Sequence, residues 1–128
     1  MGGGRGGGYG GTSNSPLTNN LRDLESKFPR SRNGNFGEKG SRADVRRISS
    51  GDSQKSADDF FRIAKRGSEG VEELRPDVYR ARFRDGSHVI YRKRSSSDGS
   101  PVVEIISKDR KSGRTRRQKI HFVERDTK

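Results

Sequence analysis

The sequence predicts an α+β domain in which an N-terminal helix, or two helices, packs on a four- to five-stranded antiparallel β-sheet. Only 24% of the 128 residues are hydrophobic and 36% are charged, so apolar side chains cannot form a core along the whole length. They gather after residue 50, where a helical pattern precedes several runs of alternating apolar and polar residues. A helix followed by an antiparallel meander is an α+β arrangement. The aromatic residues of this half include Phe60, Phe61, Tyr79, Phe83, Tyr91 and Phe122.

The first 50 residues read as a Gly-rich, polar linker. Residues 1–11 contain eight glycines, and such a composition cannot offset the entropy of ordering its backbone. Leu17, Leu21 and Leu24 have helical spacing, which is compatible with a short helix over residues 17–27 that ends before Pro29. We therefore expect residues 1–50 to be largely disordered and residues 51–128 to form the folded domain.

A clearer helix is expected from about residue 57 to residue 66. Its apolar face consists of Ala57, Phe60, Phe61 and Ala64. Ser56 begins a capping-box pattern in which Asp59 replaces the usual Glu or Gln. Gly67 follows as a favourable residue after the helix C-terminus, so this helix can cover one face of the sheet.

The strand-like runs follow the helix, and turn residues separate them. Asp85 and Gly86 mark a tight hairpin. A two-residue loop would pair Phe83 with His88, whereas a three-residue loop with a bulge at Gly86 would pair Tyr79 with Tyr91. We favour the second register because it keeps the apolar residues on one face. The runs cover residues 71–74, 78–84, 88–93, 102–108 and 118–124.

The same alternation collects polar side chains on the face opposite the core. This set combines candidate bases, two imidazoles that titrate near neutrality, and cations that could stabilise a phosphorane. Glu104 is alternatively an ion-pair partner in so basic a region, and His88 a plain surface residue beside a turn. The members are Arg82, His88, Arg92, Glu104, Lys119 and His121.

The charge of the chain favours an anionic partner. The formal net charge is +12, and residues 78–128 hold fifteen Lys or Arg against six Asp or Glu, which gives +9. Such a density favours nucleic acid or an acidic membrane. A membrane is disfavoured because no strongly amphipathic basic helix is present. A basic surface kept for solubility is the plainer alternative, but the clustering favours RNA, bound with an affinity that falls as salt rises.

No cofactor or metal is expected. The chain has no Cys and two His, so neither disulfides nor a His/Cys metal site is available, although carboxylates alone could still hold Mg²⁺. It has no apolar run of signal-peptide or membrane-span length. We expect a soluble monomer.

Four segments together resemble a known family. They are Gly51-Asp52 before the Phe-Phe helix, RDGSHVIYR (residues 84–92), SSSDGSPVVEI (residues 95–105) and KIHF (residues 119–122). This order is similar to the C-terminal toxin domains of bacterial polymorphic and contact-dependent growth-inhibition toxins. Those domains are ribonucleases of the superfold shared by barnase, EndoU, the tRNase colicins and RelE. The loop before the last strand is longer and more basic here than in that pattern.

The resemblance implies a cytotoxic endoribonuclease that cleaves tRNA or rRNA during interbacterial competition. It would be secreted or delivered as part of a larger toxin, act in the target-cell cytoplasm, and be neutralised in the producer by an acidic immunity protein. The residues suggest metal-independent transphosphorylation, with His121 as the acid and either Glu104 or His88 as the base. Arg92 and Lys119 would stabilise the developing charge.

The remaining basic residues are candidate RNA phosphate contacts, including a mobile loop over residues 110–117 without chemistry of its own. The resemblance implies that the serines after Arg92 also contact phosphate. The alternative function is a non-enzymatic, basic RNA-binding protein, for example one associated with the ribosome. The candidate contacts are Arg80, Arg82, Arg84, Lys93, Arg94, Ser96, Ser97, Lys108, Arg114, Arg116 and Arg117.

Overall fold

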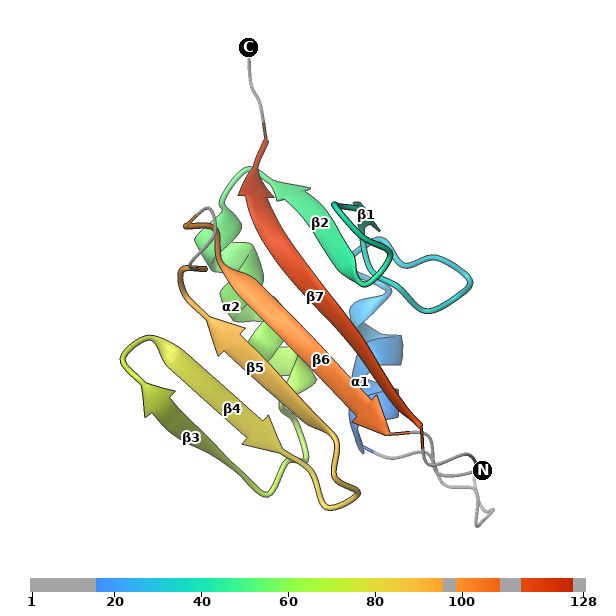
Figure 1. The fold of residues 1–128 in the computed structure, drawn as a ribbon, viewed down its shortest axis with the longest axis vertical. Helices are drawn as coiled ribbons and strands as arrows, with labels where there is room; N and C mark the ends of the chain where they lie inside the picture. The colour runs from blue at the N-terminus through green and yellow to red at the C-terminus, as the bar shows by residue number, and fades with distance from the viewer. Residues whose placement is uncertain (1–15, 96–98, 109–113, 126–128) are drawn as a thin grey trace.

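The computed structural model describes residues 16–95, 99–108 and 114–125 as two helices behind one seven-stranded mixed sheet (Figure 1). The predicted α+β class is confirmed, but the sheet has more strands than expected and is not wholly antiparallel. Its order is β1-β2-β7-β6-β5-β4-β3. No helix in the described part of the chain is long and apolar enough to cross a membrane. The elements are α1 (Pro16–Leu24), β1 (Glu38–Lys39), β2 (Val45–Ser50), α2 (Ser53–Ala64), β3 (Gly70–Arg75), β4 (Val78–Arg82), β5 (His88–Arg92), β6 (Val102–Lys108) and β7 (Thr115–Glu124).

Residues 16–50 form part of the fold, which corrects the expected linker over this range. Strand β2 lies parallel to β7, and α1 packs beside α2 on the same face of the sheet (Figure 1). Leu17, Leu24 and Phe36 belong to the same hydrophobic core as Phe60 and Phe122. The short helix expected over residues 17–27 is present in shortened form as α1. Residues 1–15 lie outside the described residues.

Two buried polar side chains fasten this N-terminal region to the rest of the domain. Asn20 on α1 donates to the carbonyl oxygens of Ala64 (2.8 Å) and Arg66 (2.7 Å), which lie at the C-terminal end of α2. These carbonyls have no partner within the helix, so the amide satisfies them. Arg46 on β2 is buried and donates through Nε to the carbonyl oxygen of Phe36 (3.0 Å). A polar sequence thus fills buried positions whose hydrogen bonds are satisfied.

The main helix begins one turn earlier than the sequence predicted. Its N-cap is Asp52, whose carboxylate accepts a hydrogen bond from the backbone N–H of Lys55 (3.1 Å). Ser56 therefore lies inside α2. The N–H of Ser53, in the first turn, donates to the Glu124 carboxylate at the end of β7 (2.8 Å). Two carboxylates thus satisfy N–H groups at the positive end of the helix.

Glu124 should make stability depend on acid pH. Hydrogen bonds from the side chain and the backbone of Ser53 lower the pKa of the Glu124 carboxyl. A lowered folded-state pKa contributes stability that is present above the unfolded pKa and is lost as pH falls through the folded pKa. We expect Glu124→Gln to lower the free energy of unfolding near neutral pH and to change it less in acid. Urea unfolding between about pH 3 and 7 measures this, and a difference independent of pH would contradict it.

The hairpin register predicted from the sequence is confirmed. Tyr79 pairs with Tyr91 and Ala81 pairs with Val89. The loop closes where the N–H of Phe83 donates to the Ser87 carbonyl oxygen (2.9 Å), and Gly86 has a φ of 94°, which favours glycine. The faces assigned to β4 and β5 are therefore correct. Tyr79, Ala81, Val89 and Tyr91 turn towards the helices, so their polar neighbours turn away from them.

Candidate functional site

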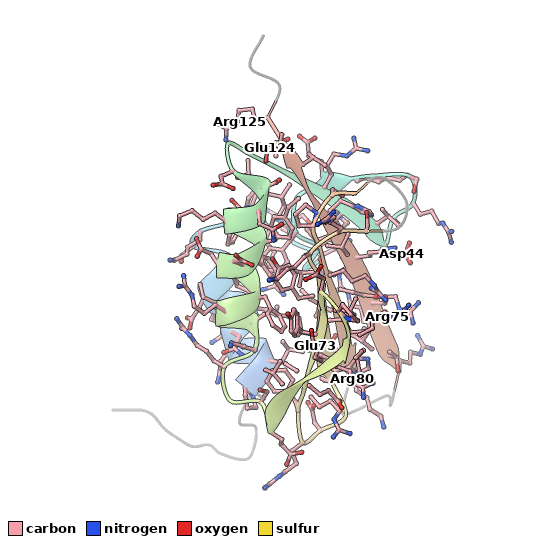
Figure 2. The ribbon with its side chains drawn as sticks, turned by 90° about the vertical axis from the view of Figure 1, so that its left-hand side faces the viewer. Asp44, Glu73, Arg75, Arg80, Glu124 and Arg125 are labelled. Atoms are coloured by element: carbon pink, nitrogen blue, oxygen red, sulfur yellow. The ribbon has the colours of Figure 1, made fainter. Side chains whose placement is uncertain are left out.

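The face of the sheet away from α1 and α2 carries the candidate site, and we call it the open face. Within the described ranges no helix covers it, and Figure 2 shows the helices on one side with Arg80 in the sheet layer on the other. The strand register places on this face all six residues that the sequence predicted to share it. Arg82 pairs with His88, and Glu104 pairs with Lys119. The full set is Arg82, His88, Arg92, Glu104, Lys119 and His121.

Glu104 lies at the centre of the open face. Its cross-strand neighbours are Ile90 on β5 and Lys119 on β7. Its carboxylate forms ion pairs with Arg92 (Nη1 to Oε1, 3.2 Å) and with Arg117 (Nε to Oε2, 3.2 Å). The Glu104 side chain is only 13% exposed, whereas that of Arg117 is 62% exposed. The carboxylate is therefore held between two guanidinium groups, and the more exposed of these, Arg117, can reach into solvent.

His121 is the diagonal neighbour of Glu104 on the adjacent strand β7. It pairs with Val102 on β6, two residues before Glu104, and with Arg47 on β2. Diagonal neighbours of this kind lie about 8 Å apart. The imidazole Nδ1 is 2.9 Å from the Ser100 hydroxyl oxygen, which helps to fix the orientation of the ring. The imidazole is half-buried, so one ring edge is positioned by the protein.

His88 lies far from His121 along the open face. It pairs with Ile106, four residues along β6 from the Val102 partner of His121. Two strand spacings of about 4.8 Å and four residues of about 3.3 Å separate the two histidines by about 16 Å. Both imidazoles share the open face, but they are too far apart to act on the same phosphate group.

Apolar residues separate the charged groups of the open face. Val102 is 0% exposed and Ile106 is 8% exposed. The cross-strand neighbours of Val102 are Arg92 and His121, and one neighbour of Ile106 is His88. The long stems of cationic side chains cover apolar surface while their charged ends stay in water. The surface that a ligand meets over these two residues is therefore formed by the cationic and imidazole side chains around them.

Much of the charge on β4 is already compensated. Arg80 donates to the Glu72 carboxylate through Nε (2.9 Å) and Nη2 (2.7 Å), and Arg82 Nε lies 3.3 Å from the same carboxylate. The hydrogen bond from Arg80 lowers the pKa of Glu72. Arg84 is 3.7 Å from Glu69. The uncompensated charge of the open face therefore lies nearer to β7 than to β3.

The other predicted phosphate contacts are scattered. Lys93 turns towards the helical side, where its Nζ lies 5.7 Å from the ring centroid of Tyr79. Arg116 also lies on the helical side, because it alternates with Arg117 along β7. Ser96 and Ser97 fall outside the described residues. Three further residues are exposed at strand ends, namely Arg94, Lys108 and Arg114.

The expected loop over residues 110–117 is corrected where the structure describes it. Thr115 begins β7, so Arg116 and Arg117 are strand residues, while residues 109–113 lie outside the described residues. Arg117 then faces Glu104, a contact that the sequence reasoning missed. The signal was the alternation of Arg117, Lys119 and His121, which extends the last strand towards its N-terminus.

Comparisons of the chain with protein-family models, with curated proteins and with solved structures found no match. The chemistry must therefore be argued from the residues of the open face. Among the described residues, no group of three or more His, Asp or Glu side chains could hold a metal ion. Near β6 and β7 the open face instead combines the Glu104 carboxylate, the His121 imidazole and several cations.

Proposed function

We propose that this protein is a metal-independent endoribonuclease that cleaves RNA by transphosphorylation. The observation that carries the proposal is the position of Glu104, with Lys119 directly opposite and His121 diagonal to it on the same open face. A carboxylate, an ammonium and an imidazole within reach of one phosphate supply a base, a charge stabiliser and an acid.

The base in this proposal is Glu104. Its carboxylate accepts the proton of a ribose 2′-OH while the oxygen attacks the adjacent phosphorus atom. Base and acid each work within about 3 Å of oxygens on one phosphorus, so they must lie within roughly 9 Å of each other. The backbone positions of Glu104 and His121 are about 8 Å apart, whereas those of His88 and His121 are about 16 Å apart, too far for their side chains to meet that limit together. This geometry favours Glu104 over His88, the alternative that the sequence left open.

The acid in this proposal is His121, which gives a proton to the departing 5′-oxygen as the P–O bond breaks. The products are a 2′,3′-cyclic phosphate and a 5′-hydroxyl. Arg92 and Lys119 stabilise the negative charge on the phosphorane. Arg117, the most exposed of these cations, is the one that can leave Glu104 for the substrate phosphate and so free the carboxylate to accept a proton. The 2′-OH requirement restricts the reaction to RNA.

The family resemblance extends this proposal to a biological role. We propose a cytotoxic ribonuclease acting on tRNA or rRNA in a target cell, neutralised in its producer by an acidic immunity protein. Such an inhibitor would be attracted to the cations of the open face. Growth arrest on expression, relieved by the partner, tests this role separately from the chemistry.

The test is incubation of the purified chain with total bacterial RNA in EDTA, followed by mapping of the new ends. We expect cleavage in EDTA, with 2′,3′-cyclic phosphate and 5′-hydroxyl ends. Cleavage that disappears in EDTA and returns with Mg²⁺ would overturn the metal-independent mechanism. Hydrolysis to 5′-phosphate ends would overturn the use of the 2′-OH.

A non-enzymatic RNA-binding protein is the second candidate, because both Glu104 carboxylate oxygens are engaged by guanidinium groups. In that case the same face binds phosphates and Glu104 only spaces the arginines. RNA that binds tightly to the chain and stays intact in every buffer would favour this second function.

A further inference from the structure

A basic hollow lies on the helical side of β7, away from the open face. It measures about 570 Å³ and is lined by Arg30, Arg32 and Arg116, with Glu25 as its carboxylate. Arg30 pairs with Glu25 (2.8 Å), so one of these positive charges is compensated. The remaining lining is polar, from Ser31, Asn33 and Gly34. Two net positive charges therefore line one recess.

The loop that forms this hollow is held in shape by the sheet. Gln118 on β7 accepts from the backbone N–H of Phe36 (2.9 Å) and donates to the carbonyl oxygen of Gly34 (3.0 Å). Arg116 donates through Nη2 to the carbonyl oxygen of Asn33 and to the Asn35 side-chain oxygen. The recess is thus preorganised, which lowers the cost of binding a ligand there.

Gly34 is required for this arrangement. Its φ of 90° is rarely adopted by other residues, and a Cβ there would lie 3.0 Å from Nη1 of Arg116. The close approach brings the loop backbone against the guanidinium group. Arg32 is exposed, and its side chain forms no hydrogen bond or ion pair with the described residues. A free cation therefore stands beside a fixed one.

The hollow continues the open face around the edge of the sheet. Pairing between β2 and β7 begins at Lys119, so β2 does not cover the edge of β7 before that residue. Arg116 and Arg117 are consecutive there and point to opposite faces. A polyanion that passes around this edge can contact both residues, and guanidinium groups bind phosphate through planar, bidentate hydrogen bonds.

We infer that the hollow lined by Arg30, Arg32 and Arg116 is a second phosphate subsite, which binds the RNA backbone beside the segment held on the open face. The inference rests on the proposed function for the identity of the polyanion. The substrate is then an RNA strand of several nucleotides that passes around the edge of β7. A dinucleotide is too short to reach both sites.

The binding test uses a fluorescent, 2′-O-methylated RNA of about ten nucleotides, which cannot undergo transphosphorylation, and measures affinity against salt. Arg32→Ala combined with Arg116→Ala should weaken binding about tenfold, and the slope of log K against log salt should fall by about 0.7 for each lost phosphate contact. The matched control, Arg62→Ala on α2 with Arg66→Ala just after it, removes equal charge and should leave the slope unchanged.

Arg116 also holds the loop that contains Asn33 and Asn35, so its substitution could disturb the local fold. A single variant at Arg32 avoids this complication. Arg32→Glu alters a side chain without a described contact and should also weaken binding, whereas Arg62→Glu should not. Wild-type affinity in Arg32→Glu, or an equal loss in both single variants, would overturn the subsite.

Cleavage kinetics separate this inference from the proposed function. With a long RNA, the double variant should raise KM with little change in kcat, and with a dinucleotide substrate it should change neither. If the wild-type chain cleaves no RNA but the double variant still binds RNA more weakly as described, the ribonuclease proposal is refuted and the subsite is supported. Normal KM in an active double variant would refute the subsite alone.

Discussion

His121→Ala should reduce RNA cleavage by a factor of about 10² to 10⁴, which is the usual contribution of a positioned general acid or base. The loss corresponds to roughly 3 to 5 kcal/mol in activation free energy. Stability and RNA affinity should stay close to those of the wild-type chain, because the imidazole is half-buried on the open face and outside the hydrophobic core. Single-turnover cleavage with saturating protein measures the chemical step.

His88→Ala is the matched control for this experiment. It removes the other imidazole of the same face, about 16 Å away by strand geometry, and should change the rate by only a few fold. A large loss in His88→Ala with normal cleavage in His121→Ala would reverse the assignment of the two histidines. Equal, normal rates in both variants would remove imidazole catalysis from the mechanism.

Glu104→Gln distinguishes the two roles left for the carboxylate. Glutamine keeps the size of the side chain and removes the negative charge, so a base at this position is lost while the spacing of Arg92 and Arg117 is largely kept. We expect the rate of cleavage to fall by a factor of at least about 10². RNA binding should become tighter, because the negative charge that repels the RNA phosphates is removed. Unchanged cleavage, measured beside binding, would leave Glu104 as an ion-pair partner alone.

The strand alternation was sufficient to predict the open face. Side chains on a strand alternate between faces with a period of two, so the hairpin register at Gly86 set the faces of β4 and β5, and the same alternation set those of β6 and β7. The signal was strong in β4, where Tyr79 and Ala81 alternate with Arg80 and Arg82. The placement of His121 beside Lys119 followed from the same pattern.

The N-terminal part of the fold could not be predicted in this way. Strand β2 reads VRRISS and buries Arg46 and Ser50 as well as Ile48, so its polar sequence gave no clear alternation. Its parallel partner β7 is about 70 residues away in the sequence. The hydrogen bonds that make burial of Arg46 tolerable come from loop carbonyls, including those of Phe36 and Gly37. Only the tertiary structure brings these groups together. The basic hollow could not be predicted for the same reason, because residues 25–34 and Arg116 are far apart in the sequence.

Phe36→Ala should lower the free energy of unfolding by about 3 to 5 kcal/mol, the usual cost of deleting a fully buried Phe side chain. Phe36 is 0% exposed, its ring centroid lies 5.1 Å from that of Phe60, and Arg30 lies over its ring at 5.1 Å. Domains of this size are stabilised by only about 5 to 15 kcal/mol in total, so the loss is a large share. Urea denaturation, followed by tyrosine fluorescence, measures it.

Val71→Ala is the control for this change, since Val71 is 44% exposed on the edge strand β3 and should cost less than about 0.5 kcal/mol. A true linker over residues 16–50 would make Phe36→Ala equally harmless, because an unfolded segment has no packing to lose. It would also let a protease trim the chain to a fragment that starts near residue 50. Because residues 16–50 belong to the core, we expect the protease-resistant fragment of the wild-type chain to begin before Leu17. Phe36→Ala should become sensitive to protease throughout the chain, because the single cooperative unit has lost a central ring.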